Sequence, residues 1–279
     1  VSSRRAMVQA RQIYAFAEGL KLKVLDVKEA KFLVETSSKS LIRYYALPSG
    51  AIVHSVSNEG RHENLDLDLY TQAFAIFGMA CAYEILPSAA FKKTALDIVF
   101  YLKSARQNPD GGYTEIKDGK VLFQSNPHMH LFEAALAWMK IDASPVWKDL
   151  SEELYQLCIQ KFIDPTTGIL AEHFNSRWEP EREDGHFVFE PGHHYEWGWL
   201  MIQYQKLAPA RKLFDLAEKM GLDGKQELVY DEVWSNGLIK KTSSRFWPQC
   251  ERVKAAVVLE KASSADLAME SLFKYYLLP

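Results

Sequence analysis

The sequence has little of what would assign it to several large classes of protein. Its three cysteines, Cys81, Cys158 and Cys250, are far apart and odd in number, so they predict neither a CxxC site nor a disulfide framework. No apolar run approaches the roughly 20 residues of a membrane span. Lys and Arg number 33 against 36 Asp and Glu, which leaves a net charge of -3 and no basic surplus for nucleic acid. We therefore expect a cytoplasmic protein with neither nucleic acid nor membrane as a partner.

Several catalytic signatures are also missing from the sequence. GxGxxG, GxxxxGK(S/T), GxSxG and HExxH do not occur, which argues against nucleotide, serine-hydrolase and zinc-protease chemistry. We expect no cofactor and no metal. A zinc site built from His193, Glu196 and His130 is the alternative, because three nitrogen and oxygen ligands would suffice.

What the sequence does contain is a helical period. Apolar residues recur three and four positions apart in most long segments, which predicts an all-α fold. The predicted helices span about 4–18, 27–45, 66–86, 89–106, 127–141, 146–162, 191–206, 208–220, 248–261 and 264–277. Strand patterns are few: 51–56 and 112–123 predict small hairpins, the second turning at Lys117-Asp-Gly, and 168–174 predicts a lone strand.

Short turns and long loops alternate between these helices. The long loops span about 46–65, 107–126, 163–190 and 221–247. This alternation predicts a ring of helical hairpins, in which the long loops at one rim build a site. Inner helices such as 66–86 and 127–141 would be apolar nearly all round, and outer ones such as 89–106 would carry more charge. No linker divides the chain, so we predict one domain over residues 1–279.

The first polar cluster begins the predicted inner helix at 127. Asn126 before Pro127 is typical of a helix start, with Asn126 capping the free amides. His128 and His130 are two apart and point to different sides of a helix, whereas His130 and Glu133 share a face. A satisfied histidine beside a helix cap is the alternative interpretation.

The second cluster begins the helix at Pro191. His193 and Glu196 lie at i and i+3, so the carboxylate can orient the imidazole and stabilise its protonated form, as a general acid or base requires. His194 faces elsewhere. Trp197 is one of several aromatic residues here that could instead belong to the core.

The third cluster surrounds Pro248, which we expect to begin a helix. Trp247 beside Gln249 and Glu251 suits a sugar, because an aromatic ring stacks on the apolar face while amide and carboxylate groups bind hydroxyls. A weaker pair, Arg11 and Tyr14, shares one face of the first helix and could equally be a solvated face.

Four segments together resemble the N-acylglucosamine 2-epimerase family. They are Gln9-Ala-Arg-Gln-Ile-Tyr-Ala-Phe-Ala, Asn126-Pro-His-Met-His-Leu-Phe-Glu-Ala, Pro191-Gly-His-His-Tyr-Glu-Trp-Gly-Trp-Leu and Arg245-Phe-Trp-Pro-Gln-Cys-Glu. They occur in the family's order and the resemblance covers nearly the whole chain. A weaker match at Leu69-Tyr-Thr-Gln-Ala-Phe has Thr71 and Gln72 where the family commonly has Asp and His.

The resemblance implies an (α/α)6-barrel and an isomerase acting at C2 of a mannose- or glucosamine-type sugar or sugar phosphate. It implies that His193 is a catalytic acid or base with Glu196 as its orienting partner, that His130 is a further catalytic residue in contact with substrate, and that Asn126 binds substrate. Sugar-binding roles are implied for Arg11, Tyr14, Trp197, Trp247, Gln249 and Glu251. Removal of the C2 proton gives an enediolate, from which either the ketose or the 2-epimer can form.

The family pattern also has a helix before the one that bears Arg11 and a last inner helix that bears a second catalytic histidine. No histidine follows His194 here. We therefore expect a barrel that lacks its first and last helices, a fragment or an incomplete member, inactive or weakly active in this form and able to form a homodimer across an apolar seam. A sugar-binding protein is the first alternative. A glycoside hydrolase that uses Glu133, Glu196 or Glu251 is the second.

Overall fold

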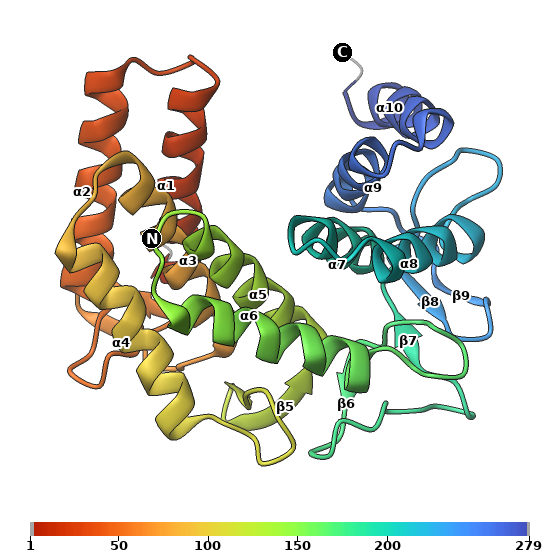
Figure 1. Cartoon of the computed structure of the whole chain (residues 1–279), viewed down its shortest axis with the longest axis horizontal. Coiled ribbons are helices and arrows are strands. Elements are labelled where there is room, and N and C mark those ends of the chain that lie inside the picture. Colours follow the sequence, from red (N-terminus) through yellow and green to blue (C-terminus); the bar gives the residue numbers. More distant parts are fainter. Residues whose placement is uncertain (1–2, 278–279) are drawn as a thin grey trace. The chain divides into compact units, whose positions relative to one another are not determined.

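The computed structural model describes residues 3–277, and ten helices contain most of them. The chain divides between Leu154 and Tyr155 into two compact units, which are described separately (Figure 1). The predicted helices are confirmed, and their ends differ from the prediction by three residues or fewer except in the sixth. No helix within residues 3–277 has the length and apolarity that a membrane crossing needs. The single domain over the whole chain stays a prediction.

The N-terminal unit consists of helical hairpins. Its helices are α1 (Ala6–Lys21), α2 (Val27–Tyr45), α3 (Leu69–Ile85), α4 (Ala89–Ala105), α5 (Ser125–Met139) and α6 (Pro145–Leu157). Helix α3 packs against both α1 and α5 (Figure 1). It is buried on nearly every side, as predicted for an inner helix. Gly78 permits the contact with α1, because a Cβ there would lie 3.2 Å from the Ala10 carbonyl oxygen.

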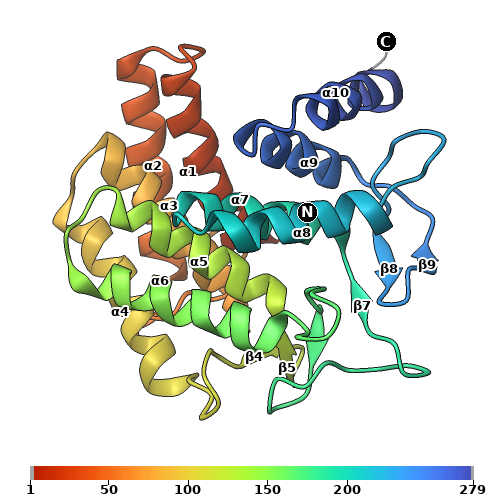
Figure 2. The same cartoon turned by 45° about the vertical axis from the view of Figure 1, so that its right-hand side comes forward.

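The C-terminal unit repeats this arrangement. A π-helical turn, Cys158–Phe162, continues α6, and α7 (Pro191–Gln203), α8 (Leu207–Met220), α9 (Phe246–Val258) and α10 (Ala262–Tyr276) follow. Helix α7 packs against α8 and α9, and α9 packs against α10 (Figure 2). The fully buried Arg252 holds three elements together, since its guanidinium binds Glu218 on α8 and Glu227 in the loop before α9.

Short strands lie in the long loops. They are β1 (Arg4–Arg5), β2 (Ser55–Val56), β3 (His62–Asn64), β4 (Glu115–Lys117), β5 (Lys120–Gln124), β6 (His173–Phe174), β7 (Val188–Phe189), β8 (Glu232–Trp234) and β9 (Ile239–Lys241). The hairpin predicted at 112–123 is confirmed as β4 and β5. Its turn places Asp118 and Gly119 at φ 49° and 70°, the left-handed conformation that a type I′ turn requires. The segment predicted at 51–56 pairs through β2 with both β1 and β3.

One hydrogen-bonding arrangement recurs in the four long loops. Each loop closes with an isolated β-bridge: Ala46 with Ile52, Gln107 with Tyr113, Ile163 with Leu170, and Leu222 with Val229. The backbone N–H of the second bridge residue then donates to the fourth residue of the following inner helix. These pairs, here called the loop–helix clamps, are Ile52–Gln72, Tyr113–His128, Leu170–His194 and Val229–Gln249.

The clamp side chains also share their second hydrogen bond. Each uses its other polar atom toward the carbonyl oxygen four residues earlier, at the residue that precedes the helix. The buried loop N–H is thereby satisfied, and the second bond fixes the clamp side chain to the backbone at the start of its helix. Glutamine and neutral histidine can each accept with one atom and donate with the other, which explains why both occur at this position.

Candidate active site

His193, the third residue of α7, has a buried carboxylate as its partner. Its Nδ1 lies 2.9 Å from Oε2 of Glu172, and both side chains are at most 5% exposed. The other Glu172 oxygen, Oε1, accepts a hydrogen bond from the backbone N–H of Glu190 at the start of α7. Nδ1–H therefore donates to Glu172. His193 Nε2 has no hydrogen-bond partner among residues 3–277 and is the nitrogen left for chemistry.

The charges around His193 favour the imidazolium. Burial acts to lower the pKa of His193, but the charge and hydrogen bond of Glu172, together with Glu190 and Glu196, raise it to about 9. Burial acts in the opposite sense on Glu172, yet His193 holds the pKa of Glu172 below its ordinary value. At neutral pH the pair is therefore an ion pair, and His193 carries a proton on each nitrogen.

Glu172 was not identified from the sequence, where Glu196 was expected to orient His193. The carboxylate bonded to Nδ1 is Glu172 rather than Glu196, which acts on His193 through its charge. A signal for Glu172 lies in the loop pattern: it is two residues after Leu170, the second bridge residue. The matching position in the next loop, Asp231, likewise accepts from the backbone N–H of Arg245 before α9.

Trp247 lies against His193, with ring centroids 5.2 Å apart. The Arg245 guanidinium carbon lies 5.3 Å from the Trp247 ring centroid, and Arg245 also binds Asp231 and Glu190. Gly192 is required beside the indole, because a Cβ there would lie only 2.6 Å from it. Helix α9 begins at Phe246, so the prediction that Pro248 begins it is wrong, and Trp247 lies within the first turn.

The N-terminal unit holds a second group of predicted residues around His130. Its imidazole packs against Tyr70 and Phe74, at centroid distances of 4.9 and 4.6 Å. The Arg11 guanidinium carbon lies 4.3 Å from the Phe74 centroid, and Arg11 Nη2 donates to the Tyr70 hydroxyl at 2.9 Å. Arg11 and His130 are thus joined through two aromatic residues of α3, an arrangement that can present a cation, a phenol and an imidazole.

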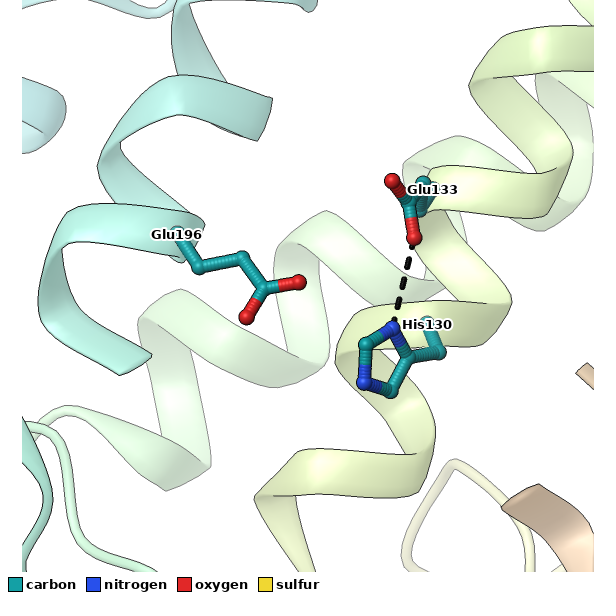
Figure 3. A group of neighbouring side chains, drawn as sticks. All are labelled: His130, Glu133 and Glu196. Carbon is teal, nitrogen blue, oxygen red and sulfur yellow. Dashed lines mark hydrogen bonds and ion pairs between the residues drawn. The ribbon is translucent and has the colours of Figure 1, made fainter. Parts of the chain in front are cut away.

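His130 also pairs with Glu133 on the next turn of α5, as the i, i+3 spacing predicted. Nδ1 lies 3.3 Å from Glu133 Oε2, as Figure 3 shows; the figure also labels Glu196, which α7 carries. Tyr14 lies one turn along α1 from Arg11 and contacts Phe77. Burial raises the pKa of the Tyr14 phenol.

The remaining predicted residues occupy other positions. Asn126 does not cap α5, which begins at Ser125 after Gln124; its buried Oδ1 has no hydrogen-bond partner within residues 3–277. Trp197 is fully buried near Phe162 in the core, which argues against its predicted sugar contact.

Two residues of α9 complete the predicted set. The amide of Gln249 is occupied by its loop–helix clamp and by Ser244, which leaves its sugar-binding role a prediction. Glu251 forms an ion pair with Lys254 at 2.5 Å.

The residues around His193 could also be considered as metal ligands. Glu172, Glu190 and His193 bring one ligand atom each within 4.8 Å of one another. Their polar atoms already serve one another and Arg245, which binds Glu190 at 2.7 Å. We therefore describe them as a hydrogen-bonded charge network.

Comparison with solved structures defines the class of protein. The chain matches a cellobiose 2-epimerase from Bacillus thermoamylovorans B4167 with a TM-score of 0.86 and 17% identity, over 98% of this chain and 76% of that one. It matches a D-mannose isomerase with a TM-score of 0.82 and 24% identity, over 98% and 74%. The fold is the (α/α)6-barrel fold of sugar epimerases and isomerases, as the family resemblance implied.

The sequence comparison identifies the family. The chain belongs to the N-acylglucosamine 2-epimerase family, whose model matches residues 1–276. It is 31% identical over 266 residues to a mannose-6-phosphate isomerase of Rhizobium meliloti (strain 1021), across 91% of this chain and 68% of that protein. The resemblance inferred from four motifs is confirmed, and the chain is a member of an isomerase family.

Proposed function

We propose that this protein moves a proton at C2 of an open-chain, mannose-type aldose or its phosphate and interconverts it with the ketose. The observation that carries the proposal is His193, buried at the start of α7 with Nδ1 bonded to a carboxylate and Nε2 available. The names of the relatives support a mannose-type sugar and favour isomerisation over epimerisation.

The chemistry follows from the acidity of a C–H bond next to a carbonyl. Loss of the C2 proton gives an enediolate, and delivery of a proton to C1 gives the ketose, whereas delivery to the opposite face of C2 gives the epimer. His193, protonated on both nitrogens, supplies the proton for the delivery step. Trp247, whose ring lies against His193, offers a surface on which the apolar face of a sugar stacks.

The second group of residues suits the polar part of the same reaction. Arg11 is a cation held by Tyr70 and Phe74, and the enediolate needs positive charge or hydrogen-bond donors near its oxygens. We assign Arg11 and Tyr14 to sugar binding, and His130 to substrate contact or proton transfer. We assign to Glu196 the role of stabilising protonated His193 through its negative charge.

Proton exchange in deuterated water tests the function. Mannose, mannose 6-phosphate, glucose and N-acetylmannosamine are incubated with the protein and followed by NMR. Deuterium at C1 or C2 together with a ketose supports the isomerase, and deuterium with only the 2-epimer shows an epimerase. Sugar binding without any exchange would contradict the proposal and support a sugar-binding protein.

A further inference from the structure

We propose that Glu172 is the positioning residue that keeps His193 a proton donor, holding Nδ1 so that Nε2–H is presented to the substrate. The role of His193 as a proton donor to a sugar rests on the proposed function. Its structural basis is the pair of hydrogen bonds that Glu172 makes within the C-terminal unit.

The position of Glu172 in the loop shows that one side chain serves two purposes. Its counterpart Asp231 accepts from the N–H of Arg245 before α9 and otherwise binds the side chains of Arg245 and Ser243. Glu172 makes the same backbone bond before α7 with Oε1, but its other oxygen binds an imidazole. Glutamate is one methylene longer than aspartate. Glu172 can therefore bind the backbone N–H before α7 and also reach the imidazole of His193, the third residue of that helix.

Burial makes the interaction strong and directional. Glu172 and His193 are 3% and 4% exposed, so the carboxylate keeps its charge only while its oxygens accept hydrogen bonds. The bond to Nδ1 fixes which nitrogen faces the carboxylate and stops the ring from flipping. Hydrogen-bonded carboxylates orient imidazoles in this way in many sites.

Other charged groups surround this pair. Glu190, the residue before α7, and Glu196 on α7 both favour the cationic ring, and Arg245 partly neutralises Glu190. His173 is one of the groups that lower the pKa of Glu172. His194 follows His193 on the helix, and burial keeps it neutral with a pKa of about 4. Glu172 is the one carboxylate in this set with a hydrogen bond to the ring.

The step assigned to His193 is then proton delivery. The Nε2–H bond breaks, a C–H bond forms on the enediolate carbon, and the imidazolium becomes neutral imidazole while Glu172 stays ionised. In the reverse direction the neutral imidazole takes the same proton back. Activity in the delivering direction therefore falls as pH rises through the pKa of His193, at about 9.

The first test is an NMR titration of histidine-labelled protein, with the His193 signal assigned by its loss in His193→Asn. Glu172→Gln should lower the pKa of His193 from about 9 to about 6.5 or below, the ordinary value. Glu196→Gln should lower it less, and Glu181→Gln, an exposed position of the same loop, should leave it unchanged. An unchanged pKa in Glu172→Gln would overturn the proposal. Because it needs no turnover, this titration stands even if no sugar is isomerised.

The second test is the pH profile of turnover. At pH 8, a pKa near 6.5 instead of 9 leaves roughly 30-fold less imidazolium, whereas at pH 6 the two proteins differ little. Glu172→Gln should therefore lose about 20-fold more activity at pH 8 than at pH 6. Equal losses at both pH values would show that Glu172 only stabilises the start of α7. Increased activity at pH 8 would show that His193 acts as a base.

A third variant guards against misfolding. Should Glu172→Gln melt below the assay temperature, Glu172→Asp retains the charge but is one methylene shorter. We expect Glu172→Asp to keep the His193 pKa above 6.5 and to lower kcat with little change in KM, because the ring is charged but less firmly held. Wild-type kcat in Glu172→Asp would contradict a positioning role.

Discussion

The starts of α5 and α7 carry the same pair of residue types in two different electrostatic settings. Each helix has a clamp histidine in its fourth position, His128 or His194, which accepts a loop N–H. Each has a second histidine, His130 or His193, beside a glutamate. The clamp histidines are equivalent, whereas the second histidines are not.

The difference lies in the origin of the glutamate. Glu133 comes from the same helix, is half-buried and lies 3.3 Å from its histidine. Glu172 comes from the loop before β6, is buried and lies at 2.9 Å. A short bond in a dry setting shifts proton affinity far more than a long one near water. The comparison shows that the effect of a glutamate on a neighbouring histidine depends on how deeply the pair is buried and on which element supplies the carboxylate.

Removing the second histidine of α7 should have the largest effect. His193→Asn should lower C2 proton exchange by a factor on the order of 100 or more, because general acid–base catalysis contributes at least that much. Exchange is measured by NMR in deuterated water. His128→Gln, at a clamp position, is the matched control and should stay within a few-fold of wild type. Substantial exchange in His193→Asn would remove His193 from the mechanism.

Replacing a clamp histidine by an apolar residue should affect stability. His194→Leu leaves the Leu170 N–H unsatisfied and removes the side-chain bond to the Glu190 carbonyl, which should lower the free energy of unfolding by about 1–3 kcal/mol. His194→Gln should cost about 1 kcal/mol or less, because Gln72 and Gln249 already serve at this position. Urea unfolding measures both. Equal losses in the two variants would show that the clamp bond is unimportant.

The clamp histidines should also make stability depend on pH. Burial lowers the pKa of His128 and of His194 to about 4, so the unfolded chain binds more protons than the native one between pH 4 and 6.5. Their stabilisation is full above pH 6.5 and is lost as pH falls toward 4.

The double variant His128→Gln/His194→Gln isolates this effect. From pH 7 to pH 4.5 it should lose roughly 2 kcal/mol less per histidine than wild type. Burial and Asp68 raise the pKa of Glu115 to about 7, which acts in the opposite sense but equally in both proteins. Parallel urea midpoints across this pH range would contradict the assignment.

The smallest effect is expected at the other His/Glu pair. Glu133→Gln should lower C2 proton exchange by only a few-fold, because a longer and partly exposed ion pair contributes little. The exchange assay in deuterated water that follows His193→Asn measures it. A loss as large as that of Glu172→Gln at pH 8 would contradict the contrast between the two pairs.

Much of the fold was predictable from the sequence because the helices carry a clear apolar period. The helix 27–45 was predicted with the bounds that the structure shows, and the hairpin at Lys117-Asp-Gly follows from local turn chemistry. The His130–Glu133 pair was predictable because an i, i+3 pair on one helix needs no tertiary information, whereas His193 binds Glu172 and not Glu196, the residue at that spacing.

Glu172, Tyr70 and Phe74 were not predicted because their roles arise from contacts across 21 to 60 residues of chain, which local spacing does not encode. Gln249 illustrates the opposite case, in which a residue type at a helix start fits two roles. Its amide beside an aromatic residue resembled a sugar contact, whereas its partners are the backbone of a loop and Ser244. Polar residues near a helix start serve binding or capping, and only the three-dimensional partners distinguish the two.

The loop–helix clamps bear on how the chain acquires its structure. Each one joins residues only 15 to 24 positions apart, so forming it closes a short loop at modest entropic cost. Local closures of this kind favour fast folding. Each long loop can therefore dock on its own inner helix before distant segments meet, and the clamp glutamines and histidines are the positions where we expect the folding rate to respond to mutation.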